Sequence, residues 1–432
     1  MAAASQPIVT NDLNDIRAVS SAADLSVDLF AHFDDPSTTG LVARFELFAV
    51  GLGSRVKEVL LCDQAGAGAP LTVQNFLNYV NDGDYVNTII HRSIPDSIIQ
   101  GGGFTIDNLA NNLANPTNAV GIIPTDPPVP NEVSSDRSNL RGTIAMANPE
   151  DEPNGATNQW FFNLGDNSAD LDNQNGGSTV FCEVLSATDL AVIDAIAAVD
   201  IFNGSGLNPA FSDLPLGFNN PNNPVITGDK NFVRYSSITV NQRDELTFSI
   251  SNNTNPGLSN VSIIDEQLVL DYLPDQFGTA DITIQATNLL GQVIEETFSV
   301  TVDKILDGSR RRDTLTGTEA PERITGFQGS DRLTGGGGRD QFIYTSPVDG
   351  GDTITDFTIG EDQIVLTTLL ERLGYNGSAP LADGLVQFRS LGSDTVVAID
   401  PDGFEGAAQA RNFLTVEGIA PAALNQVDNF IF

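Results

Sequence analysis

Four acidic residues in the last third of the chain recur at a fixed interval of nine residues. Each follows a glycine-led loop and is followed, two positions later, by one large apolar residue. Carboxylate oxygens are ligands that hard cations prefer, and glycine-rich nonapeptide repeats are typical of a parallel β-roll that holds Ca²⁺ in its turns. We therefore expect structural Ca²⁺ here, with four candidate ligands: Asp313, Glu322, Asp331 and Asp340.

The four loops do not fit this repeat equally well. Loops on one side of such a roll are eighteen residues apart, which would place Ca²⁺ between 308–313 and 326–331, and between 317–322 and 335–340. Arg310, Arg311 and Pro321 replace small residues in the first two loops. We expect one or two weak sites, with Asp331 and Asp340 as the safest ligands. A glycine-rich roll without calcium remains the alternative.

A second set of residues combines one arginine with two glutamines and several apolar side chains. It lies in the segments IIHRSIPDSIIQGGGF (89–104), LRGTIAMAN (140–148) and NQWFFNLGDN (158–167). A guanidinium presents fixed hydrogen-bond donors and stays charged at every working pH. Taken singly, Arg92 would be interpreted as a surface ion-pair partner and Phe161 as a core residue. His91 is interpreted as a packing residue and Trp160 as part of the core.

These segments, in this order, resemble the cyclophilin family of peptidyl-prolyl cis-trans isomerases, over roughly residues 38–242. The resemblance implies a closed β-barrel with two helices, proline-containing peptides as substrates and no cofactor for catalysis. It assigns Arg92 as the catalytic residue and makes Gln100 and Gln159 the residues that orient it and the substrate. The backbone of Ala147 and Asn148 would hold the residue before proline. The walls of the proline pocket would be Ile98, Phe161 and Leu171.

The chain departs from the family pattern at the apolar pocket. Asp96 and Ser97 stand where an aromatic wall is usual, Asp170 stands where tryptophan is frequent, and Ser178 lies near a position often filled by His or Tyr. Losing a Phe-sized wall costs about 1.5–3 kcal/mol of binding, so weakened activity is expected. The alternatives are a non-catalytic, calcium-dependent surface or matrix protein that grips proline-containing segments, and an adhesin in the carboxyl-terminal half.

The elements that must position these residues are mostly strands. Turn residues between two apolar runs predict a hairpin over 25–50 after a loosely ordered lead-in, and a third strand follows at 56–62. Helical spacing predicts helices over 72–80 and 190–199, and 203–230 is expected to be a long loop. Strict alternation over 235–303 is typical of a small β-sandwich, similar to cadherin-like or Ig-like modules. We predict four parts. Residues 1–37 form the lead-in with an extra strand, and residues 38–242 form the cyclophilin-like domain. Residues 243–305 form the cadherin-like or Ig-like β-sandwich, and residues 306–432 form the RTX-like calcium-binding and secretion domain.

Composition limits the partners and the compartment. A formal net charge of −37 argues against nucleic acid, and no stretch is apolar enough to cross a membrane. Cys62 and Cys182 are interpreted as small core residues, without a disulfide framework. The amino-terminal residues lack a secretory signal pattern.

The carboxyl-terminal repeats and the segment after them indicate where the protein works. They resemble the RTX repeats of serralysin-like proteins, and the last five residues, DNFIF, are similar to the export signal of that group. We therefore expect a secreted, extracellular bacterial protein that is a client of type I secretion machinery.

Overall fold

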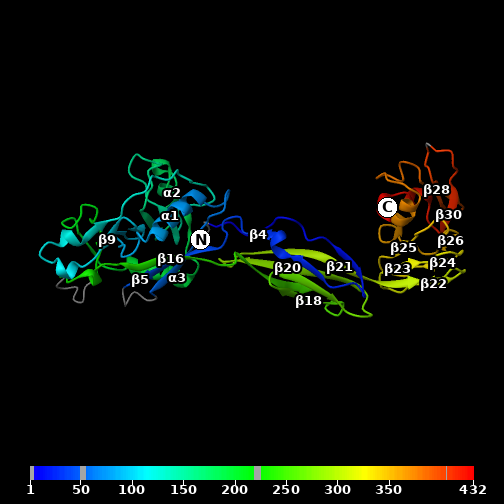
Figure 1. The fold of residues 1–432 in the computed structure, drawn as a ribbon, viewed down its shortest axis with the longest axis horizontal. Coiled ribbons are helices and arrows are strands. Elements are labelled where there is room, and N and C mark those ends of the chain that lie inside the picture. Colours follow the sequence, from blue (N-terminus) through cyan, green and yellow to red (C-terminus); the bar gives the residue numbers. More distant parts are fainter. Residues whose placement is uncertain (1–3, 49–54, 218–224, 405) are drawn as a thin grey trace. The chain divides into compact units, whose positions relative to one another are not determined.

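The structure is a computed structural model that describes residues 4–48, 55–217, 225–404 and 406–432. Strands predominate, and the helices are few and short (Figure 1). The chain forms two compact units, one made of 1–11, 30–248 and 285–295 and the other of 12–29, 249–284 and 296–432. The expected mostly β fold is confirmed. The predicted four-part division, with its cadherin-like and roll-like parts, stays a prediction.

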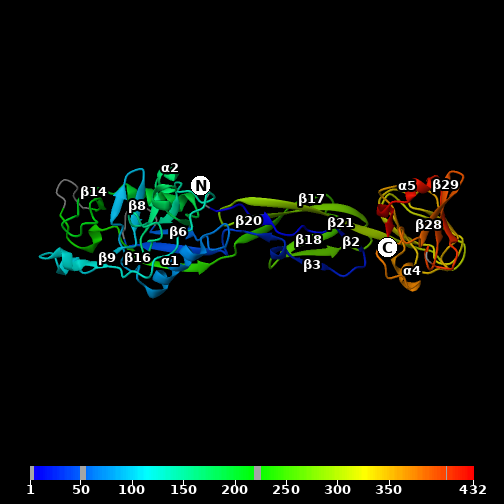
Figure 2. The same ribbon diagram turned by 90° about the horizontal axis from the view of Figure 1, so that it is seen from above.

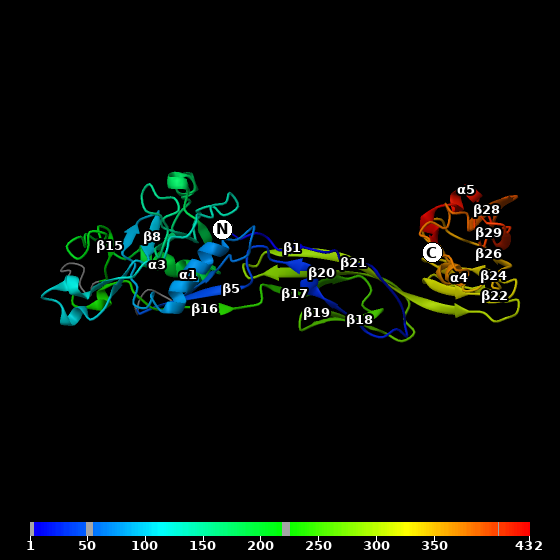
Figure 3. The ribbon, with the colours of Figure 1, turned by 45° about the horizontal axis from the view of Figure 1, so that its top comes forward.

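Two sheets form a barrel in the first unit. A five-stranded sheet has the order β13-β11-β12-β8-β7, and a three-stranded sheet has the order β16-β5-β6, with β5 and β16 side by side (Figure 3). Isolated bridges between Val59 and Val184 and between Ile89 and Arg234 join the edges of the two sheets. The strands are β5 (Leu41–Leu47), β6 (Val56–Leu60), β7 (Arg92–Ile94), β8 (Ile98–Gly101), β11 (Thr143–Met146), β12 (Trp160–Asn163), β13 (Val180–Glu183) and β16 (Tyr235–Gln242).

Helices and shorter strands complete this unit. Helix α1 covers the predicted helix and extends it at both ends. It begins at a proline and ends at Gly83, whose φ of 78° lets its N–H reach back to the carbonyl groups of the last turn. The remaining elements are β1 (Ile8–Val9), β4 (Phe33–Asp34), α1 (Pro70–Asp82), β9 (Phe104–Ile106), β10 (Val120–Ile122), α2 (Ser168–Leu171), α3 (Ala187–Ala197), β14 (Ile201–Phe202) and β15 (Leu214–Pro215).

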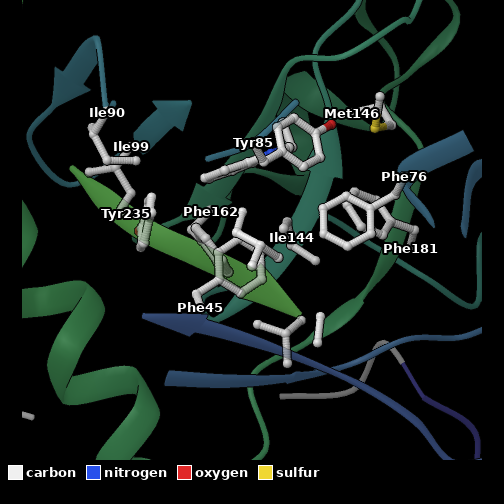
Figure 4. Packing of buried hydrophobic residues seen from close by; sticks show 14 of the residues in the cluster. Phe45, Phe76, Tyr85, Ile90, Ile99, Ile144, Met146, Phe162, Phe181 and Tyr235 are labelled. Atoms are coloured by element: carbon white, nitrogen blue, oxygen red, sulfur yellow. The ribbon is translucent and has the colours of Figure 1, made fainter. Parts of the chain in front are cut away.

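Aromatic rings fill the barrel (Figure 4). The Phe45 ring lies 5.3 Å from that of Trp160 and 5.6 Å from that of Phe162, both close to edge-on. Trp160 is fully buried, as expected of a core residue. Edge-to-face aromatic pairs add to the stability that apolar burial provides, so the sheet that carries the candidate site rests on a rigid core.

The second unit contains antiparallel sheets followed by short parallel strands. Strands β17, β20 and β21 belong to one sheet and β3, β18 and β19 to another (Figure 2). Their bounds are β2 (Ile16–Val19), β3 (Leu25–Asp28), β17 (Leu246–Asn253), β18 (Ser259–Ile264), β19 (Gln267–Tyr272), β20 (Gly278–Asn288) and β21 (Val293–Asp307). The predicted strands of 235–303 are all present.

The strands of the repeats alternate along the chain between two sheets, and within each sheet neighbouring repeat strands pair in parallel. Leu315 of β22 pairs with Leu333 of β24, and Ile324 of β23 pairs with Phe342 of β25, so each register step is eighteen residues. The elements are β22 (Thr314–Thr316), β23 (Glu322–Thr325), β24 (Arg332–Thr334), β25 (Gln341–Ile343), β26 (Asp352–Ile354), β27 (Gln363–Val365), α4 (Thr367–Arg372), β28 (Val386–Leu391), β29 (Asp394–Ile399), β30 (Arg411–Val416), α5 (Pro421–Leu424) and β31 (Phe430–Ile431).

Three expectations from the sequence are wrong. The runs at 25–50 do not form a hairpin, because β3 pairs with β19 while β5 pairs with β6 and β16. The lead-in is not loosely ordered, since β1 pairs with β4 and β2 with β21. Cys62 and Cys182 are core residues but form a disulfide, with Cα atoms 5.2 Å apart. Local pattern alone cannot reveal any of these long-range pairings. Part of the predicted loop 203–230 lies outside the described residues.

Candidate active site

The candidate residues meet on one face of the five-stranded sheet. Arg92 on β7 lies directly opposite Gln100 on β8, Gln100 lies opposite Phe161 on β12, and Phe161 lies opposite Ala145 on β11. Side chains directly opposite each other in antiparallel strands point to the same face. The register therefore places an arginine, a glutamine and an aromatic ring in one row.

Hydrogen bonds connect the polar members of this row. Nη1 of Arg92 donates to Oε1 of Gln100 at 3.3 Å, and Nε2 of Gln100 donates to Oε1 of Gln159 at 2.9 Å. The backbone of Gln159 in turn accepts from the N–H of Ala147 at 2.9 Å. Gln100 uses its oxygen toward Arg92 and its amide N–H toward Gln159. The guanidinium is half-buried and retains other N–H donors that can face a ligand.

Apolar side chains border this polar row. Ile98 and Phe161 are buried, Ala147 and Leu171 are half-buried, and all four belong to one apolar cluster. Leu171 comes from α2, in the loop after β12. The side chain of Asn148 donates from Nδ2 to the carbonyl of Gly177 at 2.9 Å, which ties the end of β11 to the loop before β13.

His91 precedes Arg92 along the chain, and its side chain interacts with Gln159 of the row. It is buried, and its ring lies 4.9 Å from that of Phe104. Burial, followed by the charge of Arg92, lowers the pKa of His91 to about 4. A neutral imidazole packed against a phenyl ring agrees with its interpretation as a packing residue.

Comparisons with known proteins place this chain in a family. The family model for "Cyclophilin type peptidyl-prolyl cis-trans isomerase/CLD" matches residues 58–209. Peptidyl-prolyl cis-trans isomerase A of Dickeya dadantii is 40% identical over 147 residues, which are 34% of this chain and 68% of that protein. The chain belongs to the cyclophilin-type peptidyl-prolyl cis-trans isomerase family. Two further members are similar: isomerase B of Escherichia coli, 37% identical over 34% of this chain and 80% of that protein, and isomerase cyp18 of Streptomyces antibioticus, 38% identical over 35% and 81%.

In the cyclophilin domain, a network of asparagines that the sequence did not single out joins the loops beside the candidate pocket residues. Nδ2 of Asn167 donates to the carbonyl of Ser97 at 2.9 Å and to Oδ1 of Asn163 at 2.7 Å. Asn163 donates to Oδ1 of Asn139 at 3.1 Å, and Asn139 donates to Oδ1 of Asp172 at 2.8 Å. The network links the loop before Ile98 to the loop that carries Leu171. The asparagine-rich composition of 158–175 was the only sequence signal for it.

The residues that depart from the cyclophilin pattern lie in or next to the loops that this network joins. Asp96 has a left-handed φ of 59°, and Ser97 accepts from the backbone N–H of Leu164 at 2.7 Å. Asp170 is exposed, and Ser178 donates from its backbone to Leu171. Small and acidic side chains thus border the candidate pocket residues on this side.

Buried carboxylates form two ladders in the repeats. The N–H of Asp313 donates to Oδ1 of Asp331, and the N–H of Asp331 donates to Oδ1 of Asp352. In the other ladder the N–H of Glu322 donates to Oδ1 of Asp340, and that of Asp340 to Oδ1 of Asp362. Asp352 and Asp362 were missed because they follow at 21 and 22 residues and not at eighteen.

In four of these carboxylates the second oxygen has no hydrogen-bond donor. These are buried oxygens of Glu322, Asp331, Asp340 and Asp352. Across the residues that the structure describes, no three His, Cys, Asp or Glu side chains converge closely enough to hold a metal by themselves. A cation here would therefore need backbone carbonyl groups of the glycine-rich loops in addition to the carboxylates, which is a donor set that Ca²⁺ accepts.

Proposed function

We propose that Arg92 accelerates rotation about X–Pro bonds by stabilising the twisted amide without forming a covalent bond. The observation that carries this proposal is the chain of hydrogen bonds from Arg92 through Gln100 to Gln159, beside the apolar side chains of Ile98 and Phe161. Rotation has a barrier of about 18–20 kcal/mol because the amide C–N bond has double-bond character. As the amide twists, its nitrogen becomes pyramidal and can accept a hydrogen bond.

The arrangement supports the two tasks that such catalysis requires. The apolar side holds the proline ring, and the guanidinium offers donors that Gln100 keeps in one orientation. An interaction accelerates the reaction only if it is stronger in the transition state than in the ground state. A donor directed at the amide nitrogen satisfies this condition, because a planar amide nitrogen is a poor acceptor. The reaction involves no proton transfer, so the buried neutral His91 need not act as a base.

A peptide isomerisation assay tests this proposal. We expect Arg92→Ala to lower kcat/KM by about tenfold to a hundredfold, the loss of one charge-assisted hydrogen bond. The matched control is Arg44→Ala, an exposed arginine on β5, which should retain full activity. If Arg92→Ala kept full activity, Arg92 could not be the catalytic residue. Family membership favours an enzyme over a non-catalytic binder, and a chain that binds X–Pro peptides without isomerising them would reverse that preference.

We further propose that the repeats bind one or two structural Ca²⁺ ions. The support is the set of buried carboxylate oxygens without donors, and burial raises the pKa of Asp340 to about 8 and that of Asp352 to about 7. A bound cation would offset the cost of burying these groups in their ionised form. With weak sites, about 10 mM Ca²⁺ should add about 1.4–2.7 kcal/mol of stability per site. Asp331→Asn and Asp340→Asn should remove this gain, whereas exposed Asp244→Asn should not. A Ca²⁺-independent unfolding free energy would refute the proposal.

We propose that the protein is exported by type I secretion machinery. Outside the cell, extracellular proteins would be its substrates. Support comes from the disulfide, since disulfides persist in oxidising compartments, and from the repeats, which could fold where Ca²⁺ is plentiful. None of the helices in the described residues is long and apolar enough to cross a membrane. Co-expression with a type I exporter should release the chain into the medium. Retention in the cells would count against the proposal.

A further inference from the structure

The few positive charges of this acidic protein are concentrated at the start of the repeats. Seven of the twenty lysines and arginines lie between Lys304 and Arg339, including the triplet Arg310 to Arg312. All three side chains of the triplet are exposed. Within the described residues, Arg310 forms no ion pair with a carboxylate. Arg310 therefore offers an exposed positive charge that can attract an anionic group.

A cavity of about 430 Å³ lies at this surface, a volume within the range of small-ligand sites. Two guanidinium groups line it, Arg310 from the first repeat loop and Arg372 from the last turn of α4. One carboxylate, Asp349, also lines it, but its Oδ2 accepts from the N–H and the hydroxyl of Thr345 at 3.1 and 3.0 Å. The two arginines thus leave the cavity with an excess of positive charge.

Phe327 lines the same cavity and is unusual in both its exposure and its backbone conformation. Its side chain is 37% exposed, and its backbone has a left-handed φ of 63°, a region that a bulky residue rarely adopts. Nine residues later the equivalent loop position is Gly336, with a φ of 95°, which is the residue type that such a turn favours. Strained and exposed residues of this kind tend to occur at binding sites. Val348, also exposed, lies on the same lining.

We propose that this cavity binds an anionic saccharide, with a carboxylate or sulfate on the guanidinium groups of Arg310 and Arg372 and a sugar ring against Phe327. Guanidinium groups match the geometry of such anions through paired hydrogen bonds. The side chains of Gln328 and Ser346 supply polar partners for sugar hydroxyls. Because the net charge of −37 repels a long polyanion, affinity must come from these short-range contacts with a few sugar units. The site is independent of the isomerase activity.

Calorimetric titration of the full chain, at one fixed Ca²⁺ concentration, tests the proposal. The probes are a hyaluronan tetrasaccharide for carboxylate, a heparin-derived disaccharide for sulfate and neutral chitotriose as the control. We expect at least one anionic probe to bind and chitotriose not to bind. Arg310→Gln and Arg372→Gln should each weaken binding at least about tenfold, the loss of one charge-assisted hydrogen bond. Phe327→Asn, which keeps a residue that tolerates the left-handed turn, should weaken it as well.

Arg311→Gln is the matched control. Arg311 follows Arg310 in the chain and carries the same charge, but its side chain does not line the cavity. The variant should leave binding within about twofold of the wild type. Equal losses in Arg310→Gln and Arg311→Gln would overturn the proposal in favour of diffuse attraction. The proposal would also be overturned if neither anionic saccharide bound. The same holds if phosphatidylglycerol vesicles bound instead of the saccharides and their binding depended on the same arginines. If Phe327→Asn fails to fold, the three arginine variants decide the matter.

Discussion

Nη1 of Arg92 lies 3.3 Å from Oε1 of Gln100, the residue directly opposite it in the neighbouring strand. The contact is a cross-strand pair within the sheet, so its geometry is fixed by the register of β7 and β8 and not by a flexible loop. Gln100 is held in turn by its bond to Gln159. The orientation of the guanidinium is therefore a property of the barrel.

This relationship predicts that Gln100 and Arg92 act as a unit. Gln100→Ala frees the guanidinium to rotate, and we expect kcat/KM to fall by about tenfold to a hundredfold, the worth of one hydrogen bond to a charged group. The double variant with Arg92→Ala should be little worse than Arg92→Ala alone, because residues that act together give non-additive losses. Additive losses in the isomerisation assay would show that Gln100 works on the substrate independently of Arg92.

A second prediction concerns Asn167, which ties the Ser97 loop to Asn163. Asn167→Ala should loosen the pocket walls that carry Ile98 and Leu171, so KM should rise several-fold while kcat changes little, because the guanidinium stays in place. Each lost hydrogen bond also costs about 0.5–1.5 kcal/mol of stability. Steady-state kinetics and chemical unfolding measure the two effects.

Asn173→Ala is the matched control for Asn167→Ala. Its amide makes only long contacts, 3.5 and 3.3 Å, to carbonyl groups of its own loop, so both KM and stability should stay near the wild-type values. A drop in kcat without a change in KM in Asn167→Ala would contradict a role in shaping the pocket. Partial rescue of KM by Asn167→Gln, which keeps the amide, would support it.

The residues of the candidate row could be picked out from the sequence because they lie in short segments with strong local patterns. Arg92, Gln100 and Phe161 occupy neighbouring strands, and strand order fixes their register once the barrel is recognised. The asparagine network escaped prediction because Asn139, Asn163 and Asn167 resemble ordinary loop residues until the loops are brought together. Polar networks of this kind depend on tertiary geometry, which a linear pattern does not contain.

The same limit explains the wrong expectations for the fold. Turn residues between β3 and β5 predicted a hairpin, but β3 pairs with β19, more than two hundred residues away along the chain. The nine-residue repeat singled out Asp331, whereas Asp352 lies outside the period and joins the ladder of Asp331 only through the parallel stacking of β24 and β26. Periodicity predicts repeated contacts and fails where the repeat ends.

The disulfide gives a third prediction. Cys62 and Cys182 are separated by 120 residues, so the bond closes a long loop and restricts the unfolded chain. In denaturant without reductant, a thiol reagent should find no free thiol, and after reduction it should find both cysteines. The double variant Cys62→Ala/Cys182→Ala should lose about 2–5 kcal/mol of unfolding free energy. Two free thiols in unreduced protein would contradict the bond, and equal stability of the oxidised and reduced chains would contradict its stabilising effect.

The last prediction concerns a lysine inside the barrel. Lys57 is completely buried, its Nζ lies 4.6 Å from the ring centre of Phe162 and 4.3 Å from that of Tyr235, and it donates to the hydroxyl of Tyr235. Burial lowers the pKa of Lys57 well below 10.5. Between that lowered folded-state pKa and 10.5, the unfolded chain binds one proton more than the folded chain, so stability rises with pH by about 1.4 kcal/mol per unit.

Lys57→Met should abolish this part of the pH dependence. Because the substitution also leaves the Tyr235 hydroxyl without its partner, the informative quantity is the slope and not the absolute stability. Urea unfolding at about pH 8 and about pH 10 should show a slope lower than that of the wild type by about 1.4 kcal/mol per unit. Exposed Lys230→Met should keep the wild-type slope. Equal slopes for Lys57→Met and the wild type would mean that Lys57 remains charged within the barrel, held by its contacts with the aromatic rings.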